Sequence, residues 1–227
     1  TGVWWPRVFA LGALNFSIFW AMLFLSAYRL PGGVAAAVGA VQPMMVVWLA
    51  SVLLGSPLQL RSVLAALVGL GGVALLVLTP QVALDPVGVA AGLAGAASMA
   101  LGTVLTRKWR PPVPLLTFTA WQLTAGGLLL LPVALLLNPP LPTLNTANLA
   151  ALLWLGLLGT ALSYIVWFRG LARLELAVAS SLGFLSPMTA VLLGWVILGQ
   201  TLSMPQLLGI SLVIGGIWFG QQKSKAK

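Results

Sequence analysis

The sequence predicts an all-α integral membrane protein, a helical bundle built from inverted-topology repeats. Three observations support this fold class. The chain is 60% hydrophobic and only 6% charged, whereas soluble domains carry about 25% charged residues. Its apolar residues fall into long uninterrupted segments. A block near the start of the chain also recurs 144 positions later.

Eight apolar segments follow one another along the 227 residues. Each is about 16–23 residues long, near the roughly 20 that cross a hydrocarbon core as a helix. Helices are expected because lipid cannot satisfy open backbone groups. Glycine and proline mark most segment ends and the connections are short, so one membrane bundle accounts for the chain. The predicted segments are 8–28, 33–54, 62–79, 86–106, 115–137, 149–171, 176–198 and 206–221.

The repeat aligns residues 29–72 with residues 173–216 without a gap. The shift of 144 positions carries the first segment onto the sixth, and five helices is an odd number. The two copies therefore cross the membrane in opposite senses, as in secondary transporters whose substrate site lies at the repeat interface. Identical pairs include Arg29/Arg173, Gly39/Gly183, Pro43/Pro187, Met44/Met188, Gly55/Gly199, Leu58/Leu202 and Gly72/Gly216.

The same shift leaves the segments 86–106 and 115–137 without partners in the first copy. We therefore expect two further helices before Thr1, so that eight transmembrane helices are present out of an expected ten. The chain, which does not begin with methionine, is expected to start partway through a longer one. On this interpretation residues 1–80 are the last three helices of the first repeat, and residues 81–227 are the five helices of the second.

Composition excludes several function classes. With 2 acidic residues, no histidine and no cysteine, the chain has no disulfides, thiol nucleophiles, His or Cys metal sites or Ser-His-Asp triads. We expect no cofactor. The net charge of +9 does not indicate nucleic acid, because the basic residues stand singly between apolar runs. Ten of the 11 basic residues fall on one side when both termini are cytoplasmic, and Arg29 alone falls outside.

Specific motifs then point to a family. The block Gly39-x-x-x-Pro43, Leu54-Gly55-x-x-Leu58 and Gly71-Gly72, with its second copy, resembles the EamA-type transporters of the drug/metabolite transporter superfamily. The tract AYRLPGGVA at 27–35 resembles the amino-acid and pigment exporter branch. The resemblance covers essentially the whole chain. It implies a ten-helix fold and export of small metabolites, such as amino acids, across the bacterial inner membrane by alternating access.

The repeat prolines Pro43 and Pro187 lie near the middles of the second and seventh segments. Each removes a backbone hydrogen bond to the carbonyl four residues earlier, which belongs to Gly39 or Gly183. A free carbonyl at membrane depth is tolerated where it meets protein or lines a water-filled cavity. We interpret the four residues as hinge candidates, with a static kink as the alternative.

Neutral polar and aromatic side chains supply the candidate substrate cavity. Such groups suit a zwitterionic or amide-bearing solute, with tryptophan and tyrosine faces for stacking. The alternative for each residue is an ordinary hydrogen bond between helices. The candidates are Asn15, Trp20, Gln42, Trp121, Gln122, Ser163, Tyr164, Trp167 and Ser186.

Both carboxylates, Asp85 and Glu175, fall in connections. Proton-driven pumps usually place such a group inside the membrane, so coupling would use a residue outside this chain, or the protein is a uniporter or exchanger. The expected partners are a small-molecule substrate and the lipid bilayer. The glycine-rich faces of the third and eighth segments leave a homodimer open, although packing within one chain is favoured. A transport-inactive fragment or scaffold is the alternative function, followed by an intramembrane enzyme.

Overall fold

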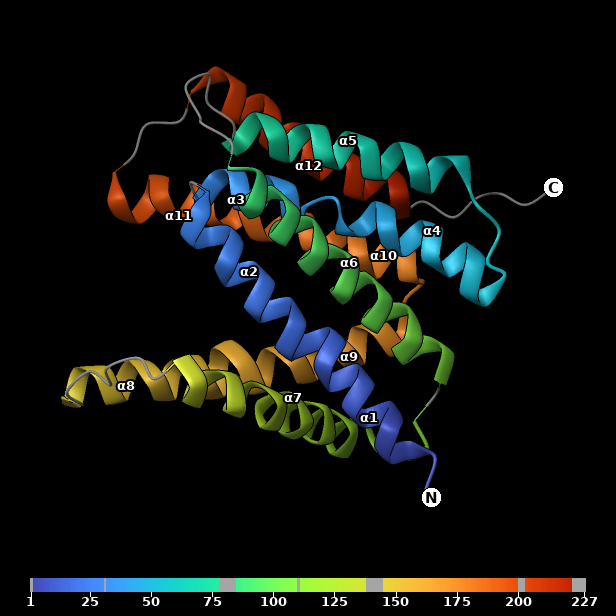
Figure 1. Cartoon of the computed structure of the whole chain (residues 1–227). Helices are drawn as coiled ribbons and strands as arrows, with labels where there is room; N and C mark the ends of the chain where they lie inside the picture. Colours follow the sequence, from blue (N-terminus) through green and yellow to red (C-terminus); the bar gives the residue numbers. More distant parts are fainter. Residues whose placement is uncertain are drawn as a thin grey trace.

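The computed structural model describes residues 2–30, 32–77, 85–109, 111–137, 145–199 and 203–221, and every element in these ranges is helical (Figure 1). Pro31, Arg110 and the three lysines of the C-terminal tail, used above, lie outside the described residues. The elements are α1 Trp4–Gly12, η1 Ala13–Ser17, α2 Ile18–Arg29, α3 Gly32–Gly39, α4 Gln42–Leu54, α5 Leu60–Val77, α6 Pro86–Trp109, α7 Leu115–Leu137, α8 Thr146–Trp154, η2 Leu155–Leu162, α9 Ser163–Arg173, α10 Leu176–Ser181, η3 Leu182–Phe184, α11 Leu185–Leu198 and α12 Met204–Gln221.

Each of the eight apolar segments predicted from the sequence is helical over most of its described residues, which confirms the helical bundle; the end of the segment 62–79 lies outside the described residues, and the segment 33–54 is interrupted by a turn. Five stretches are long and apolar enough to cross a membrane, namely Trp4–Arg29, Val34–Leu54, Pro86–Trp109, Leu116–Leu136 and Thr146–Arg173. The other three segments correspond to shorter apolar helices, Leu60–Leu75, Leu176–Thr189 and Met204–Gly220. The chain is thus a multi-pass membrane protein in which helices account for each hydrophobic segment.

Two long stretches each contain a π-helical insertion at matching places. The first is Ala13–Ser17 between α1 and α2, and the second is Leu155–Leu162 between α8 and α9. Residues 13–17 shifted by 144 become 157–161, which lie inside the second insertion. A π-helical turn widens the backbone and is frequent at functional sites.

The helices that carry the repeat prolines are both interrupted just before the proline. α3 ends at Gly39 and α4 begins at Gln42, with a turn at residues 40–41 between them. In the second copy the 3-10 helix η3 separates α10 from α11. The α-helix is therefore interrupted at nearly the same position of both copies, by a turn in the first and by a 3-10 helix in the second.

The ends of α4 and α11 are also matched. Gly55 and Gly199 follow these helices with φ angles of +66° and +65°. This left-handed conformation favours glycine, which lacks the Cβ that strains other residues there. The pairing of these two glycines in the sequence thus has a backbone reason in both copies.

The repeat-equivalent helices α5 and α12 pack side by side (Figure 1). A Cβ on Gly72 would lie 2.8 Å from the carbonyl oxygen of Gly209, and one on Gly216 would lie 3.0 Å from that of Ala65. Gly72 and Gly216 are equivalent under the shift of 144, as are Ala65 and Gly209. From the contact of Ala65 with Gly216 to that of Gly72 with Gly209, residue numbers rise along α5 and fall along α12, so the two helices run antiparallel.

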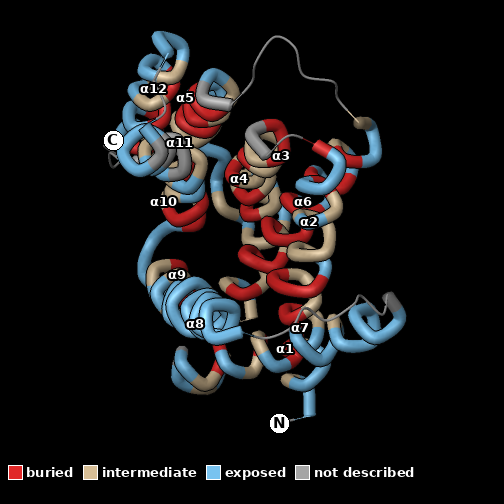
Figure 2. Tube along the Cα trace, turned by 90° about the vertical axis from the view of Figure 1, so that its left-hand side faces the viewer, coloured by how far each residue is buried: buried red, intermediate tan, exposed pale blue. Residues whose placement is uncertain are grey.

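The two π-containing stretches differ strongly in burial. Around Trp4–Arg29, 33% of the most apolar window is buried, whereas none of the corresponding window in Thr146–Arg173 is. Figure 2 shows α8 and the helix that continues it as exposed, beside a buried centre formed by α2, α4 and α6. A Cβ on Gly12 would lie 2.9 Å from Ala125 on α7, but one on the equivalent Gly156 meets nothing within 4 Å. One face of α8–η2 is uncovered where its repeat mate is packed.

The close contact of α5 and α12 leads to a first prediction. Gly72→Ala places a methyl group against the backbone of α12, so we expect a loss of about 1–3 kcal/mol of stability from overpacking. The measurement is the thermal unfolding midpoint of the purified protein in detergent. Gly71→Ala is the matched control, because a Cβ at Gly71 meets nothing within 4 Å. An equal effect of both substitutions would contradict the packing explanation.

Candidate functional site

A buried amide cluster joins three helices. The Nδ2 group of Asn15, inside η1, donates to Oε1 of Gln122 on α7 at 2.8 Å and approaches Oγ1 of Thr106 on α6 at 3.4 Å. Asn15 and Gln122 are both 0% exposed. A Cβ on Gly102 would overlap the Asn15 amide, so glycine at that place makes room for it. The cluster is therefore a close contact among α6, α7 and η1.

The amide cluster retains unused hydrogen-bonding capacity. Oδ1 of Asn15 and Nε2 of Gln122 are buried without a hydrogen-bond partner among the described residues, as is the hydroxyl of Thr103 on α6. Buried polar atoms without partners are costly in a low-dielectric interior. Two uncharged amides at this depth cost far less than an ionised group would. The interior between these helices is polar but neutral.

Serine hydroxyls at the ends of the two π-helical turns donate to backbone carbonyls. Ser17 donates to the carbonyl of Gly126 on α7 at 2.8 Å. Ser163 donates at 2.8 Å to the carbonyl of Leu158, five residues earlier in its own stretch. Ser163, a predicted cavity residue, thus bonds its own backbone and lies on the exposed side of the helix.

An aromatic cluster lies between the two repeats. Nε1 of Trp20 on α2 donates to the hydroxyl of Tyr164 on α9 at 3.2 Å, and these two residues are 144 positions apart. The ring of Phe16 meets that of Tyr164 edge-on at 4.6 Å, and Phe168 packs within 6.4 Å of Phe16. Trp20 and Tyr164, which are equivalent positions of the sequence repeat, therefore lie in direct contact.

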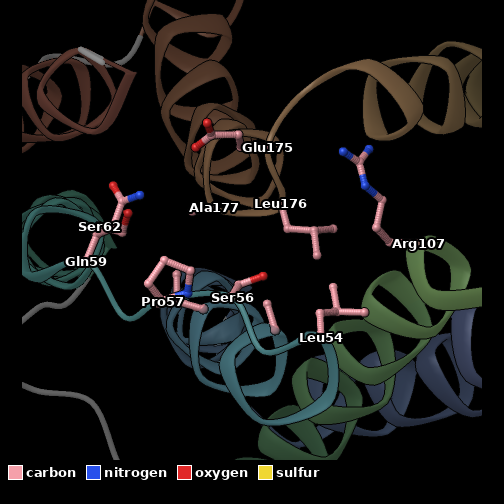
Figure 3. Close-up of a pocket in the computed structure, with 11 residues that line it drawn as sticks. Leu54, Ser56, Pro57, Gln59, Ser62, Arg107, Glu175, Leu176 and Ala177 are labelled. Carbon is pink, nitrogen blue, oxygen red and sulfur yellow. The ribbon is translucent and has the colours of Figure 1, made fainter. Parts of the chain in front are cut away.

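A cavity of about 280 Å³ opens beside the linker between α4 and α5 (Figure 3). The C-terminal part of α6 and the start of α10 form its other walls. It carries one basic side chain, Arg107, and one acidic side chain, Glu175. A much narrower space of about 10 Å³ shares Val47, Ser62 and Ala177 with it and continues to Pro43. The full lining of the larger cavity is Val47, Ala50, Leu54, Ser56, Pro57, Gln59, Ser62, Arg107, Glu175, Leu176 and Ala177.

Two further cavities adjoin each other near the start of α7. One, of about 430 Å³, is lined in part by Thr106, Phe118 and Phe168. The other, of about 550 Å³, is lined by Trp4, Trp5, Val8, Pro112, Val113 and Trp121. The two cavities share Val113, both have aromatic rings in their linings, and Thr106 of the buried amide cluster borders the smaller one.

Basic residues gather at one end of the bundle. Arg7 lies over the ring of Trp109 at 5.5 Å, which brings the start of α1 to the end of α6. Nε of Arg61, at the start of α5, donates to the carbonyl of Phe219 near the end of α12 at 2.7 Å. Nη1 of Arg107 donates to the carbonyl of Leu171 on α9 at 2.6 Å.

The opposite end carries a single ion pair among the described residues. Arg29, at the end of α2, lies 3.5 Å from Asp85. The backbone N–H of Gly88 donates to Asp85 at 2.9 Å. This hydrogen bond, then one from the backbone of Val87 and then the nearby Arg29 charge, lower the pKa of Asp85 below its ordinary value. Asp85 thus precedes the first turn of α6 and pairs with the one described basic residue at this end.

The predicted cavity residues are only partly brought together. Asn15 contacts Gln122, and Trp20 contacts Tyr164. Trp121 stacks on Trp5 with ring centroids 6.3 Å apart. The other candidates are not part of these pairs. Gln42 is half-buried at the start of α4, and Ser163 and Ser186 are exposed. Trp167 is half-buried, and its Nε1 has no hydrogen-bond partner among the described residues.

The hinge candidates differ in their surroundings. Pro43 borders the 10 Å³ space and Pro187 is half-buried. A Cβ on Gly39 or on Gly183 would meet nothing within 4 Å.

Two charged residues of the 280 Å³ cavity are missing from the sequence-based prediction. Arg107 is interpreted there only as a residue that orients the chain, and Glu175 only as part of a connection. One feature of the sequence could have pointed to Glu175: it is one of only 2 acidic residues in the chain. What the sequence could not supply is the packing that brings the start of α10 beside the end of α6.

Comparison with known proteins agrees with this architecture. The model of the EamA-like transporter family matches residues 1–78 and 86–219. The chain belongs to this family. It is therefore a membrane transporter by family and not a member of an enzyme family, which confirms the resemblance described above.

Several relatives cover most of the chain. Protein PecM of Dickeya dadantii is 46% identical over 217 residues, which span 94% of this chain and 73% of PecM. A protein of Streptantibioticus cattleyicolor named "Probable terminal-alkyne amino-acid exporter" is 26% identical, over 93% of this chain and 71% of that protein. A solved crystal structure superimposes with a TM-score of 0.82 at 22% identity, covering 96% of this chain and 76% of the other. The last likeness concerns the fold alone.

The buried amide pair leads to a second prediction. Gln122→Leu leaves the Asn15 amide buried without its 2.8 Å acceptor, so we expect a loss of about 1–3 kcal/mol. Adding Asn15→Leu removes the stranded group and should recover much of that loss, because neither member then needs a partner. Thermal unfolding of both single variants and the double variant measures the coupling. Strict additivity of the two losses would contradict a structural partnership.

Proposed function

We propose that this chain exports small metabolites, amino acids or related compounds, across the bacterial inner membrane by alternating access. Family membership supports secondary transport, and the name of the Streptantibioticus cattleyicolor relative at 26% identity supports amino acids as the solute class. The neutral, aromatic interior around Trp20 and Tyr164 suits an uncharged or zwitterionic solute better than a phosphorylated one. Efflux is the direction that the exporter-like tract at 27–35 supports.

The observation that carries the proposal is the contact between repeat-equivalent residues. Trp20 bonds Tyr164, and α5 packs antiparallel to α12 through equivalent glycines. These contacts support inverted repeats related by a pseudo-two-fold axis. Transporters with such repeats bind solutes at the repeat interface and rock one half against the other. The aromatic contact is then where the two halves meet at the centre.

The uncovered face of α8–η2 supports two additional helices. In the first copy the equivalent face of α1–η1 is packed by α6 and α7, which belong to the second repeat. Symmetry places a matching helical pair over α8–η2, for a total of ten helices with five in each repeat. On this proposal residues 1–80 complete the first repeat and residues 81–227 form the second.

The same uncovered face supports one rival. Without a covering pair, this chain would be a transport-inactive fragment or a scaffold whose apolar face binds other membrane helices. A homodimer through that face belongs to the same rival. Reconstitution of the chain with and without the two extra helices separates these functions.

The distribution of charge supports the proposed orientation. Arg7, Arg61 and Arg107 lie at one end of the bundle, and Arg29 lies at the other. Positive side chains favour the cytoplasmic side. We assign the basic end, with the starts of α1 and α5 and the end of α12, to the cytoplasm.

The breaks before Pro43 and Pro187 are the proposed hinges. Gly39 and Gly183 lie at these breaks, and a Cβ on either meets nothing within 4 Å. Close packing therefore does not require glycine at these places. Backbone freedom is the remaining physical reason for a glycine there, and freedom to bend is what a hinge needs.

Transport by reconstituted protein is the third prediction. We expect proteoliposomes that contain the chain extended by two N-terminal helices to carry labelled neutral amino acids, and to leave labelled sugar phosphates behind. The 227-residue chain is assayed beside it. Counterflow with unlabelled amino acid on the opposite side distinguishes carrier-mediated exchange from leakage. No amino-acid movement by the extended form would contradict the proposed substrate class.

The hinge is tested in the same assay. Gly39→Ala and Gly183→Ala should lower the transport rate and leave the unfolding midpoint near that of the parent, because neither methyl group meets a neighbour. If the loss of transport is explained by a fall in stability, the result would contradict the hinge and support static kinks at these breaks.

The two tyrosines of the chain allow a fourth, matched prediction. Tyr164→Phe removes the hydroxyl that Trp20 donates to, and an interhelical hydrogen bond in a membrane averages about 0.6 kcal/mol. We expect roughly a threefold change in transport rate if the halves separate at this contact. Tyr28→Phe is the control, since Tyr28 is 88% exposed. Equal behaviour of both variants would exclude the central contact from the transport cycle.

A further inference from the structure

The cavity between the α4–α5 linker, α6 and α10 contains two opposite charges that do not pair with each other. Arg107 comes from α6, and Glu175 precedes α10 (Figure 3). Among the described residues, the one salt bridge is that of Arg29 with Asp85 at the other end of the bundle. The cavity thus offers a guanidinium donor and a separate carboxylate acceptor in one lining.

The guanidinium of Arg107 is held in place. Its Nη1 donates to the Leu171 carbonyl at 2.6 Å, and its side chain is half-buried. This bond fixes the plane of the guanidinium and leaves its other N–H groups for a second acceptor. A guanidinium presents its donors in a rigid fork that matches a carboxylate.

The carboxylate of Glu175 is exposed and has no hydrogen bond or ion pair among the described residues. Apart from Arg107, its neighbours around the cavity are neutral polar groups and apolar side chains. The carboxylate is therefore available to accept the N–H groups of an ammonium ion.

From these positions we infer that the Arg107–Glu175 cavity is an entry site for a zwitterionic α-amino acid, and this inference rests on the proposed function. Arg107 receives the solute carboxylate, and Glu175 receives its ammonium group. Val47, Ala50, Leu54 and Leu176 supply an apolar wall for the side chain. The volume of about 280 Å³ is just below the range of roughly 300–1,000 Å³ that holds larger ligands, and so suits a small solute.

The charge pattern also discriminates between solutes. A dicarboxylate would bring a second negative charge to Glu175, and an organic cation would bring its positive charge to Arg107. Like-charge contacts of this kind give specificity by repulsion. Only a molecule with both charges satisfies both walls.

A second, much smaller space adjoins the cavity. It borders Pro43, shares Val47, Ser62 and Ala177 with the cavity, and has a volume of about 10 Å³, at the lower limit of the space that one water molecule needs. The solute would therefore wait beside the proposed hinge and move inward only when that region opens. The entry site and the hinge share Val47 and Ala177 as wall residues.

The test is a chemical double-mutant cycle on the full chain in detergent and in proteoliposomes. The probes are L-leucine, leucinamide, which lacks the carboxylate, and N-acetyl-leucine, which lacks the ammonium group. Arg107→Gln and Glu175→Gln should each weaken leucine binding roughly tenfold or more, as expected for lost hydrogen bonds to charged groups. Arg169→Gln is the control, because Arg169 is an exposed basic residue on α9.

The analogues assign each charge to its partner. Glu175→Gln should weaken leucinamide but not N-acetyl-leucine, and Arg107→Gln should do the reverse. Equal weakening of all three probes by one variant would show a structural role and overturn the inference, as would unchanged leucine affinity in both variants. Because Arg107 also bonds Leu171, Arg107→Lys is included, and it should restore part of the leucine affinity.

Binding and transport are measured separately, so the two proposals can fail separately. Selective binding in detergent without movement in proteoliposomes would support the site and contradict the proposed export. Amino-acid transport whose KM is unchanged by both variants would support export and overturn the site.

Discussion

The close approach of α5 and α12 is the constraint on which the rest of the structure depends. Within lipid, helices gain little from burying apolar surface against each other, so association relies on van der Waals contact between small residues. Gly72 on α5 and Gly216 on α12 each allow the backbone of the other helix to come close. α5 and α12 are equivalent in the sequence repeat and run antiparallel, and Trp20 lies against its own equivalent, Tyr164, as the proposed inversion of the two copies requires.

The placement of polar groups follows a second constraint, the cost of charge inside a membrane. Among the described residues the interior holds amides, hydroxyls and aromatic rings, and the charged side chains lie at the two ends. Asn15 and Gln122 pair with each other because an amide in that position has few alternatives. A solute that crosses such a bundle meets full charges only at its ends. Selection by charge therefore belongs at an end, and the centre can select by shape and hydrogen bonding.

Much of the fold could be predicted from the sequence because its signals are local. Apolar segments of spanning length gave the helices, and the shift of 144 gave the equivalence of Gly55 with Gly199 and of Trp20 with Tyr164. The π-helical turns were not predicted, because several helical hydrogen-bonding patterns fit the same apolar sequence. Nor was the cavity between Arg107 and Glu175, since it depends on how helices 68 residues apart in the sequence pack. The pairing of Asn15 with Gln122 likewise needed tertiary structure to separate a bond between helices from a group that faces a solute.

The two copies share a topology but not a conformation, and this difference has a mechanical meaning. The first copy is broken by a turn at residues 40–41, and the second by the 3-10 helix η3. If both copies took one shape, the two ends of the bundle would be equivalent and neither would be favoured for solute entry. On the proposed alternating-access mechanism, unequal shapes would let one end open while the other is closed. An exchange of shapes between the copies would then reverse the ends, with α5 and α12 as the fixed contact and the proposed hinges at Gly39 and Gly183 as the places where the backbone bends.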